Sequence, residues 1–202
     1  AEKGYPQVEL PTNLKSLATV MKAAGYKVIY KGKWHCSKPA IPGEAKPSDL
    51  EKYGFSRWNP PDAGANQTVP EAGGGFVDND GRFVNSVGTG EDEGVLQYLD
   101  SNAPKEQPFF MVISLVNPHD VLFYPSKTFN EAGYDDSWLE GSIQPPRTNE
   151  EDLSTKPTVQ AEFLKIFNLT GAPETKAEKQ AYLNYYGNLM RSSDSYLVNV
   201  LD

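Results

Sequence analysis

Residues 25–39 read GYKVIYKGKWHCSKP, and this stretch decides the fold. It begins as an apolar, β-prone strand and ends in a turn, punctuated by glycine, that carries Lys33 and His35. In an extended backbone, residues two apart point to the same side, so both side chains can address one ligand. Open α/β sheets place their ligand sites at the ends of such strands. The stretch therefore predicts a strand of an α/β sheet with a candidate site at its end.

Positive charge gathers around this predicted strand. No acidic residue lies between Glu9 and Glu44, whereas six lysines do, namely Lys15, Lys22, Lys27, Lys31, Lys33 and Lys38. The whole chain has a formal net charge of −8, so this local excess indicates a site for an anion. The alternative is that the lysines are solvated flanks of the strand and that the histidine is a hydrogen-bonded loop residue.

The composition excludes several classes of protein. With 202 residues, of which 38% are hydrophobic, the chain can bury one core, which makes one domain or part of one. The acidic balance, with a pI near 4.9 and no basic patch with interleaved aromatic residues, argues against a nucleic-acid partner. No run of eighteen apolar residues exists, so no membrane span is expected. The single cysteine, Cys36, excludes an internal disulfide and leaves the compartment open among periplasmic, secreted and cytoplasmic.

A short helix is expected just before the strand. Apolar residues fall at helical spacing from Leu14 to Ala24, with Thr12 or Asn13 as the N-cap and Gly25 just beyond the end. The helix and the strand then form one αβ step, and the apolar stripe of the helix belongs to the core.

A second buried strand is the other landmark. Residues 109–116, FFMVISLV, form a near-continuous apolar run, as expected for a strand covered on both faces, and NPHD follows at 117–120. The chain has only two histidines, and both follow a predicted buried strand, where parallel sheets place ligands. We therefore expect Lys33, His35 and His119 to face one cleft. A turn that His119 merely caps is the alternative.

Between the two strands, the sequence predicts a long loop, a hairpin and a helix. Residues 39–75 are rich in proline and glycine and lack periodicity, which indicates an ordered loop. Residues 76–84 read FVDNDGRFV and predict a β-hairpin with a tight polar turn. The acidic residues at 91–93 suit the first turn of a helix that runs to about Asp100.

After the second strand, residues 121–173 are rich in loop-forming residues, with many acidic residues and prolines. Thr175 and Glu178 then match a capping box, which predicts the start of a helix that runs to Leu201. Its buried face is expected to be built from Tyr182, Tyr185, Tyr186, Leu189, Tyr196, Leu197 and Val200.

Three motifs, in this order, resemble the type I sulfatases, a family of the alkaline-phosphatase superfamily. AGYK at 24–27 followed by GKWH at 32–35 resembles the segment that leads into the sulfatase active site. YGF at 53–55 resembles the segment that follows, and PFF at 108–110 with NPHD at 117–120 resembles a later one. The resemblance implies an α/β fold with an alkaline-phosphatase-like, mainly parallel sheet and helices on both faces, incomplete in this chain.

The resemblance also implies roles for individual residues. Lys33 corresponds to the lysine that contacts the sulfate and bridges to the nucleophile, and His35 to the histidine that holds the formylglycine hydroxyl. His119 corresponds to the histidine that reaches the sulfate near the bridging ester oxygen. Substrate binding is then expected to involve Asn117, Arg57 and Trp58.

Some parts of the family pattern are absent. The resemblance runs from about Leu10 to Asp202, so residues 1–202 are expected to be part of a sulfatase catalytic domain, without the nucleophile-bearing N-terminal part and the C-terminal Asp-His-Gly part. The motif C/S-x-P-x-R, whose first residue becomes formylglycine, does not match the residues after Cys36. The complete enzyme would use a divalent metal, calcium by the resemblance, with no ligand in this chain. We therefore expect the chain alone to be inactive.

The implied function is hydrolysis of a sulfate monoester whose alcohol is a small molecule or a carbohydrate. Two alternatives stay open. A phosphodiesterase or phosphonate monoester hydrolase of the same superfamily shares this kind of site, and a non-catalytic anion-binding protein could keep the fold without the nucleophile. The sequence does not indicate the oligomeric state.

Overall fold

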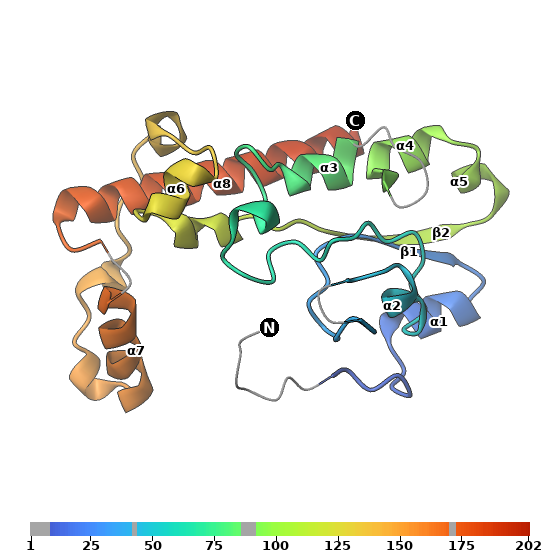
Figure 1. Cartoon of the computed structure of the whole chain (residues 1–202), viewed down its shortest axis with the longest axis horizontal. Helices are drawn as coiled ribbons and strands as arrows, with labels where there is room; N and C mark the ends of the chain where they lie inside the picture. The colour runs from blue at the N-terminus through green and yellow to red at the C-terminus, as the bar shows by residue number, and fades with distance from the viewer. Residues whose placement is uncertain (1–8, 42–43, 86–91, 170–172) are drawn as a thin grey trace.

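Two parallel strands, β1 (Lys27–Gly32) and β2 (Phe109–Ser114), lie at the centre of the computed structural model (Figure 1). It describes residues 9–41, 44–85, 92–169 and 173–202. The register pairs Lys27 with Phe109 and Gly32 with Ser114. The predicted α/β class and the parallel pairing of these two strands are confirmed.

The other elements of the described residues are helical. In chain order they are α1 (Leu17–Ala23), α2 (Ser48–Glu51), η1 (Val69–Glu71), α3 (Asn79–Asn85), α4 (Val95–Asp100), α5 (Ala103–Glu106), η3 (His119–Phe123), α6 (Lys127–Glu131), η4 (Asp136–Leu139), η5 (Arg147–Glu150), η6 (Leu153–Thr155), α7 (Thr158–Leu169) and α8 (Lys176–Leu201). None of the helices in this described part combines the length and the apolar character that crossing a bilayer requires.

Helices lie on both sides of the strand pair. Figure 1 shows α1 and α2 on one side, and α3, α4 and the long α8 on the other. On the first side, Val28 and Tyr30 of β1 pack in one core cluster with Ala18 of α1, Leu50 of α2 and Trp58. Alternate residues of a strand point to opposite faces, so this face is built from the even-numbered positions.

The opposite face of β1 buries a charge. Lys31 is 0% exposed, and its Nζ lies 3.3 Å from Oε2 of Glu93. Burial lowers the pKa of Lys31 to about 8, although the charge and hydrogen bond of Glu93 raise it. This lysine is therefore not free to bind an anion, contrary to what the cluster of lysines indicates.

A second core lies between α8 and the segment after β2. Tyr185 and Leu189 of α8 pack there with Phe123, Phe129 and Tyr134. The hydroxyl of Tyr185 donates to the backbone oxygen of Asp120 at 3.2 Å, which ties α8 to η3. The predicted capping box at Thr175 and Glu178 is present, and α8 runs to Leu201 as predicted. Its predicted buried face is wrong in part, because Tyr186 and Leu197 are exposed.

Other predictions about elements need correction. The helix before β1 is capped by Ser16, whose hydroxyl accepts from the backbone N–H of Thr19, not by Thr12 or Asn13. The predicted hairpin at 76–84 is wrong: α3 stands there, because the carboxylate of Asp78 accepts from the backbone N–H of Gly81 and so caps a helix.

The helix predicted to begin with the acidic residues at 91–93 begins later. It does run to Asp100, but it begins at Val95 after an N-cap at Gly94, so Glu93 is free to pair with Lys31. Glu91 lies outside the described residues. The stretch 121–173 is less irregular than predicted, since it contains α7.

Candidate active site

The backbones of β1 and β2 lie in close contact at the ends of the two strands. Gly32 has a φ of 102°, and a Cβ at this position would lie 1.9 Å from the carbonyl oxygen of Ser114. Only glycine allows this approach. The next backbone N–H, that of Lys33, donates to the same oxygen at 2.8 Å. The side chain of Lys33 therefore emerges at the carboxyl ends of both strands.

One carboxylate holds the loop that carries His35. Asp62 accepts from the backbone N–H groups of Trp34 and His35, each at 2.7 Å. Burial raises the pKa of Asp62, whereas these two N–H groups lower it. His35 has a φ of 48°, which is rare for a residue other than glycine. Its ring is exposed and makes no side-chain hydrogen bond to any residue that the structure describes.

Cys36 is not prepared for nucleophilic attack. Its Sγ lies 3.1 Å from the backbone oxygen of Trp34 and donates to it. Burial and the charge of Asp62 both raise the pKa of the thiol. The thiolate is the nucleophilic form, so this environment keeps Cys36 in its unreactive form.

A second carboxylate holds the turn that follows β2. Asp80 of α3 is 1% exposed and accepts from the backbone N–H groups of Val116 at 2.5 Å and Asn117 at 3.0 Å. Burial raises the pKa of Asp80 to about 7, while the two N–H groups act in the opposite direction. The contact fixes the position at which the chain leaves the sheet.

The same turn brings His119 against a third carboxylate. Nδ1 of His119 lies 3.2 Å from Oδ1 of Asp120, which is 0% exposed. Oδ2 of Asp120 accepts from the backbone N–H groups of Gly73 at 2.7 Å and Gly74 at 3.1 Å, and from the hydroxyl of Tyr134. The imidazole is 14% exposed, with its ring edge-on to Phe123.

The two strand ends meet at Gly64. Its carbonyl oxygen accepts from Nζ of Lys33 at 2.5 Å. A Cβ on Gly64 would lie 2.7 Å from Cγ1 of Val116 and 3.2 Å from Nζ of Lys33. Lys33 and the end of β2 therefore pack against the same glycine. That Lys33, His35 and His119 face one cleft stays a prediction.

A comparison with family models matches the sulfatase family over residues 2–202, which is nearly the whole chain. The chain belongs to the sulfatase family. No curated protein and no solved structure gives a significant match. Membership of this family makes the chain part of a sulfatase-like hydrolase.

Two residues that the sulfatase resemblance suggests for substrate binding have other partners in this fold. Trp58 is 1% exposed, and its indole N–H donates to the backbone oxygen of Gly32 at 2.7 Å, as a core residue does. Arg57 forms an ion pair with Glu93 and stacks over the ring of Tyr98, with 5.0 Å from Cζ to the ring centroid. Neither Trp58 nor Arg57 is part of the site proposed here.

Asn117 is also mostly buried. Its side-chain oxygen accepts from the backbone N–H of Asp120 at 3.3 Å, which stabilises the turn. A Cβ on Gly73 would lie 2.8 Å from Cγ of Asn117. The amide of Asn117 therefore shapes the turn that presents His119.

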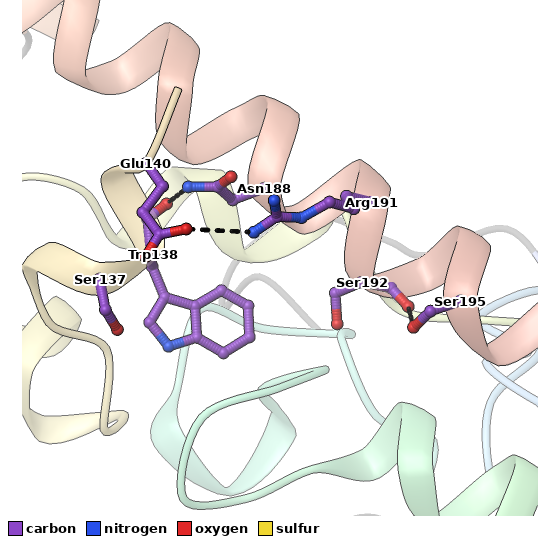
Figure 2. A pocket seen from close by; sticks show the side chains of 7 residues that line it. All are labelled: Ser137, Trp138, Glu140, Asn188, Arg191, Ser192 and Ser195. Carbon is purple, nitrogen blue, oxygen red and sulfur yellow. Dashed lines mark hydrogen bonds and ion pairs between the residues drawn. The ribbon is translucent and has the colours of Figure 1, made fainter. Parts of the chain in front are cut away.

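A cavity of about 480 Å³ lies between η4 and α8 of this sulfatase chain. Figure 2 shows the indole of Trp138 on one side and Asn188, Arg191 and Ser192 of α8 on the other. The hydroxyl of Ser193, which is not one of the lining residues, donates to the backbone oxygen of Asn117 at 3.3 Å and ties α8 to the turn after β2. Its lining residues form no sequence motif, so this cavity is not predictable from local sequence patterns.

Metal ligands of the kind that sulfatases use are not gathered in the described residues. No group of three or more His, Cys, Asp or Glu side chains comes together there in a way that could hold a metal ion. The three carboxylates of Asp62, Asp80 and Asp120 are each occupied by backbone N–H groups. These three carboxylates do not fit a metal site.

Proposed function

We propose that these 202 residues form part of the catalytic domain of a sulfuric ester hydrolase. It releases sulfate from the monoester of a small alcohol or a carbohydrate. Lys33, His35 and His119 are the residues that act on the substrate. Asn117 supports the turn that carries His119.

The observation that carries this proposal is the meeting of two strand ends at Gly64. Lys33 leaves β1 and the NPHD turn leaves β2 at the same edge of a parallel pair. An ammonium group and an imidazole at this edge provide two donors for the oxygens of an anion. The match to the sulfatase family supports a sulfate ester as the anion.

The chemistry of these residues is charge stabilisation and proton transfer. Lys33 neutralises the negative charge that grows on the sulfate oxygens in the transition state. His119 in its protonated form gives a proton to the departing alcohol oxygen, and His35 handles a proton on the side of the nucleophile. Such donors accelerate a reaction that a separate nucleophile begins.

The sequence contains no C/S-x-P-x-R motif, so we propose that the 202 residues alone do not turn over sulfate esters. Cys36 is the only thiol, and its raised pKa keeps it protonated. The test is an assay of the isolated 202-residue protein on nitrophenyl sulfate. No turnover is expected. Turnover that disappears in Cys36→Ser would overturn the proposal and make Cys36 the nucleophile.

The role of His119 is tested in the complete enzyme with two leaving groups. His119→Ala should lower kcat by about 10²-fold to 10⁴-fold for a sulfate ester of a poorly leaving alcohol. The loss for nitrophenyl sulfate should be much smaller, because a good leaving group needs little protonation. His35→Ala is the matched control and should lower kcat for both substrates alike.

Two outcomes would count against the proposal. An equal loss in His119→Ala for both leaving groups would assign the acid role to another residue, with Lys33 the next candidate. Faster turnover of a phosphate diester or phosphonate monoester of the same alcohol would transfer the protein to the phosphorus branch of the superfamily.

A further inference from the structure

We propose that Asp120 is the positioning residue for His119, which it fixes in the tautomer with the proton on Nδ1 and the lone pair on Nε2. This inference rests on the proposed function, since it explains how His119 meets the leaving group. It assigns a role to a buried carboxylate that does not itself touch the substrate.

The hydrogen bonds of the Asp120 carboxylate show that it acts as an acceptor toward His119. Oδ2 accepts from three donors, the backbone N–H groups of Gly73 and Gly74 and the hydroxyl of Tyr134. Burial and the charge of Asp120 raise the pKa of Tyr134 far above its ordinary value, so its hydroxyl keeps its proton. With donors on Oδ2, the carboxylate is stabilised as an anion.

Oδ1 of Asp120 is left for the imidazole. It lies 3.2 Å from Nδ1 of His119. A carboxylate oxygen only accepts hydrogen bonds, so the ring nitrogen facing it must carry the proton. A ring that donates from one nitrogen to a carboxylate presents the other for chemistry. In His119 that other nitrogen is Nε2.

The residues around Asp120 and His119 stabilise the contact between them. A Cβ on Gly74 would lie 2.9 Å from the hydroxyl oxygen of Tyr134, so a larger residue would disturb the donor set. Phe123 stands edge-on to the imidazole, with ring centroids 6.2 Å apart. The other buried carboxylate beside this turn, Asp80, is directed at the backbone N–H groups of Val116 and Asn117.

The consequence for the reaction is a defined proton path. In imidazolium form, His119 holds its Nδ1 proton against Asp120 and its Nε2 proton toward the leaving group. As the nucleophile of the complete enzyme bonds to the sulfur, the S–O bond to the alcohol breaks. The electron pair of that bond passes to the alcohol oxygen, which takes the Nε2 proton. The alcohol leaves neutral, and His119 returns to the Nδ1–H tautomer. Asp120 stays ionised throughout and stabilises the charged ring.

The first experiment reads the tautomer directly. Long-range ¹H–¹⁵N spectra of the uniformly labelled protein at pH 9 report which ring nitrogen carries the proton. The chain has two histidines, so His35→Gln assigns the signals. His119 should show a protonated Nδ1 and an unprotonated Nε2, whereas the exposed His35 should show the mixture of a free imidazole. An Nε2–H tautomer at His119 would overturn the inference.

A pair of variants gives a second reading. In Asp120→Asn, the amide oxygen takes the three donors and the NH₂ group faces Nδ1, so the tautomer of His119 should invert. Tyr134→Phe is the matched control, because it removes one donor from Oδ2 and leaves the contact with His119, and its tautomer should not change. An unchanged tautomer in Asp120→Asn would contradict the role of Asp120.

Kinetics then separate this inference from the proposed function. In the complete enzyme, Asp120→Asn should lower kcat by about 10²-fold or more for the poorly leaving alcohol, with KM little changed. Nitrophenyl sulfate should be affected much less. An Nδ1–H tautomer together with equal losses for both substrates would support the contact with Asp120 and overturn the acid role of His119.

Discussion

Three aspartates share one pattern at the scale of the single residue. Each accepts from the backbone N–H groups of two consecutive residues: Asp62 from 34 and 35, Asp80 from 116 and 117, and Asp120 from 73 and 74. Loop backbone near a sheet has no ladder partners, and a buried N–H without a partner is costly. These carboxylates supply the partners, and so give irregular loops a defined position.

Gly64 offers the sharpest test of the local geometry. Gly64→Ala should destabilise the fold by about 2–5 kcal/mol, from a left-handed φ and from overpacking against Val116 and Lys33. The φ of this glycine is 71°, and the new Cβ would be 2.7 Å from Cγ1 of Val116. Urea unfolding at constant m-value measures the change.

Gly25→Ala is the matched control for Gly64→Ala. Gly25 has a φ of 88°, but a Cβ there meets nothing within 4 Å. It should cost only the strain of the left-handed conformation, about 1–2 kcal/mol. Equal losses for the two variants would mean that Val116 and Lys33 yield freely, and that the strand ends are not held together at Gly64.

The sequence predicts some of the candidate site and misses the rest for a physical reason. The positions of Lys33 and His119 after two strands follow from local runs of apolar residues. The prediction that the second strand is covered on both faces is wrong, because β2 is only half-buried. Asp62 and Asp80 carry no such signal, because their partners lie 27 and 28, and 36 and 37, residues away. The burial of Trp58 has no signal in the sequence either, because an aromatic residue in a loop gives the same local pattern whether it packs inward or lines a pocket.

At the scale of the element, α8 depends on its first turn. The hydroxyl of Thr175 accepts from the backbone N–H of Glu178, and the Glu178 carboxylate accepts from the N–H of Thr175. Thr175→Ala should weaken this end by about 1 kcal/mol. Hydrogen exchange of the amides at 177–180 should become faster, while exchange near Leu189 should not change.

Thr68→Ala is the control for the capping bond. Thr68 is also an N-cap residue, that of η1, but its side chain makes no capping hydrogen bond. The stability should change by less than about 0.5 kcal/mol. A loss as large as that of Thr175→Ala would mean that the capping box adds nothing beyond the propensity of threonine.

The elements that the sequence predicts correctly are those with a long apolar run, or with helical spacing that begins at a capping motif. β1, β2 and α8 are of this kind. The prediction of a hairpin at 76–84 is wrong because Asp-Asn-Asp-Gly fits a tight turn and a helix N-terminus equally well. Tertiary contacts decide which of the two forms. Asp80 must reach Val116 and Asn117, and a helix gives it that direction.

At the scale of the whole molecule, Asp80 couples folding to pH. Its pKa rises from an ordinary 3.8 to about 7 in the folded protein, mainly through burial. Between these values the folded protein holds a proton that the unfolded chain has lost. The contribution of Asp80 to stability therefore falls as pH rises from about 4 to about 7, by up to about 1.4 kcal/mol per pH unit.

The measurement is urea unfolding of wild type and Asp80→Asn over pH 4 to 8. Asn has no carboxyl to titrate, so the difference between the two curves isolates Asp80 from the other acidic groups. The advantage of wild type should shrink as the pH rises. A difference that stays constant across this range would show that Asp80 is ionised throughout, held so by its two N–H donors.

The pairing of β1 with β2 also sets a delay during synthesis. Lys27 pairs with Phe109, about 80 residues later in the chain. At a translation rate of about 5–20 residues per second, β1 waits some 4–16 s for its partner strand to leave the ribosome. In that interval KVIYKG is an unpaired, apolar edge, of the kind that aggregates. The charges of Lys27 and Lys31 flank it and oppose self-association. We therefore expect Lys31, whose ammonium group loses its water in the folded protein, to keep the nascent chain from aggregating.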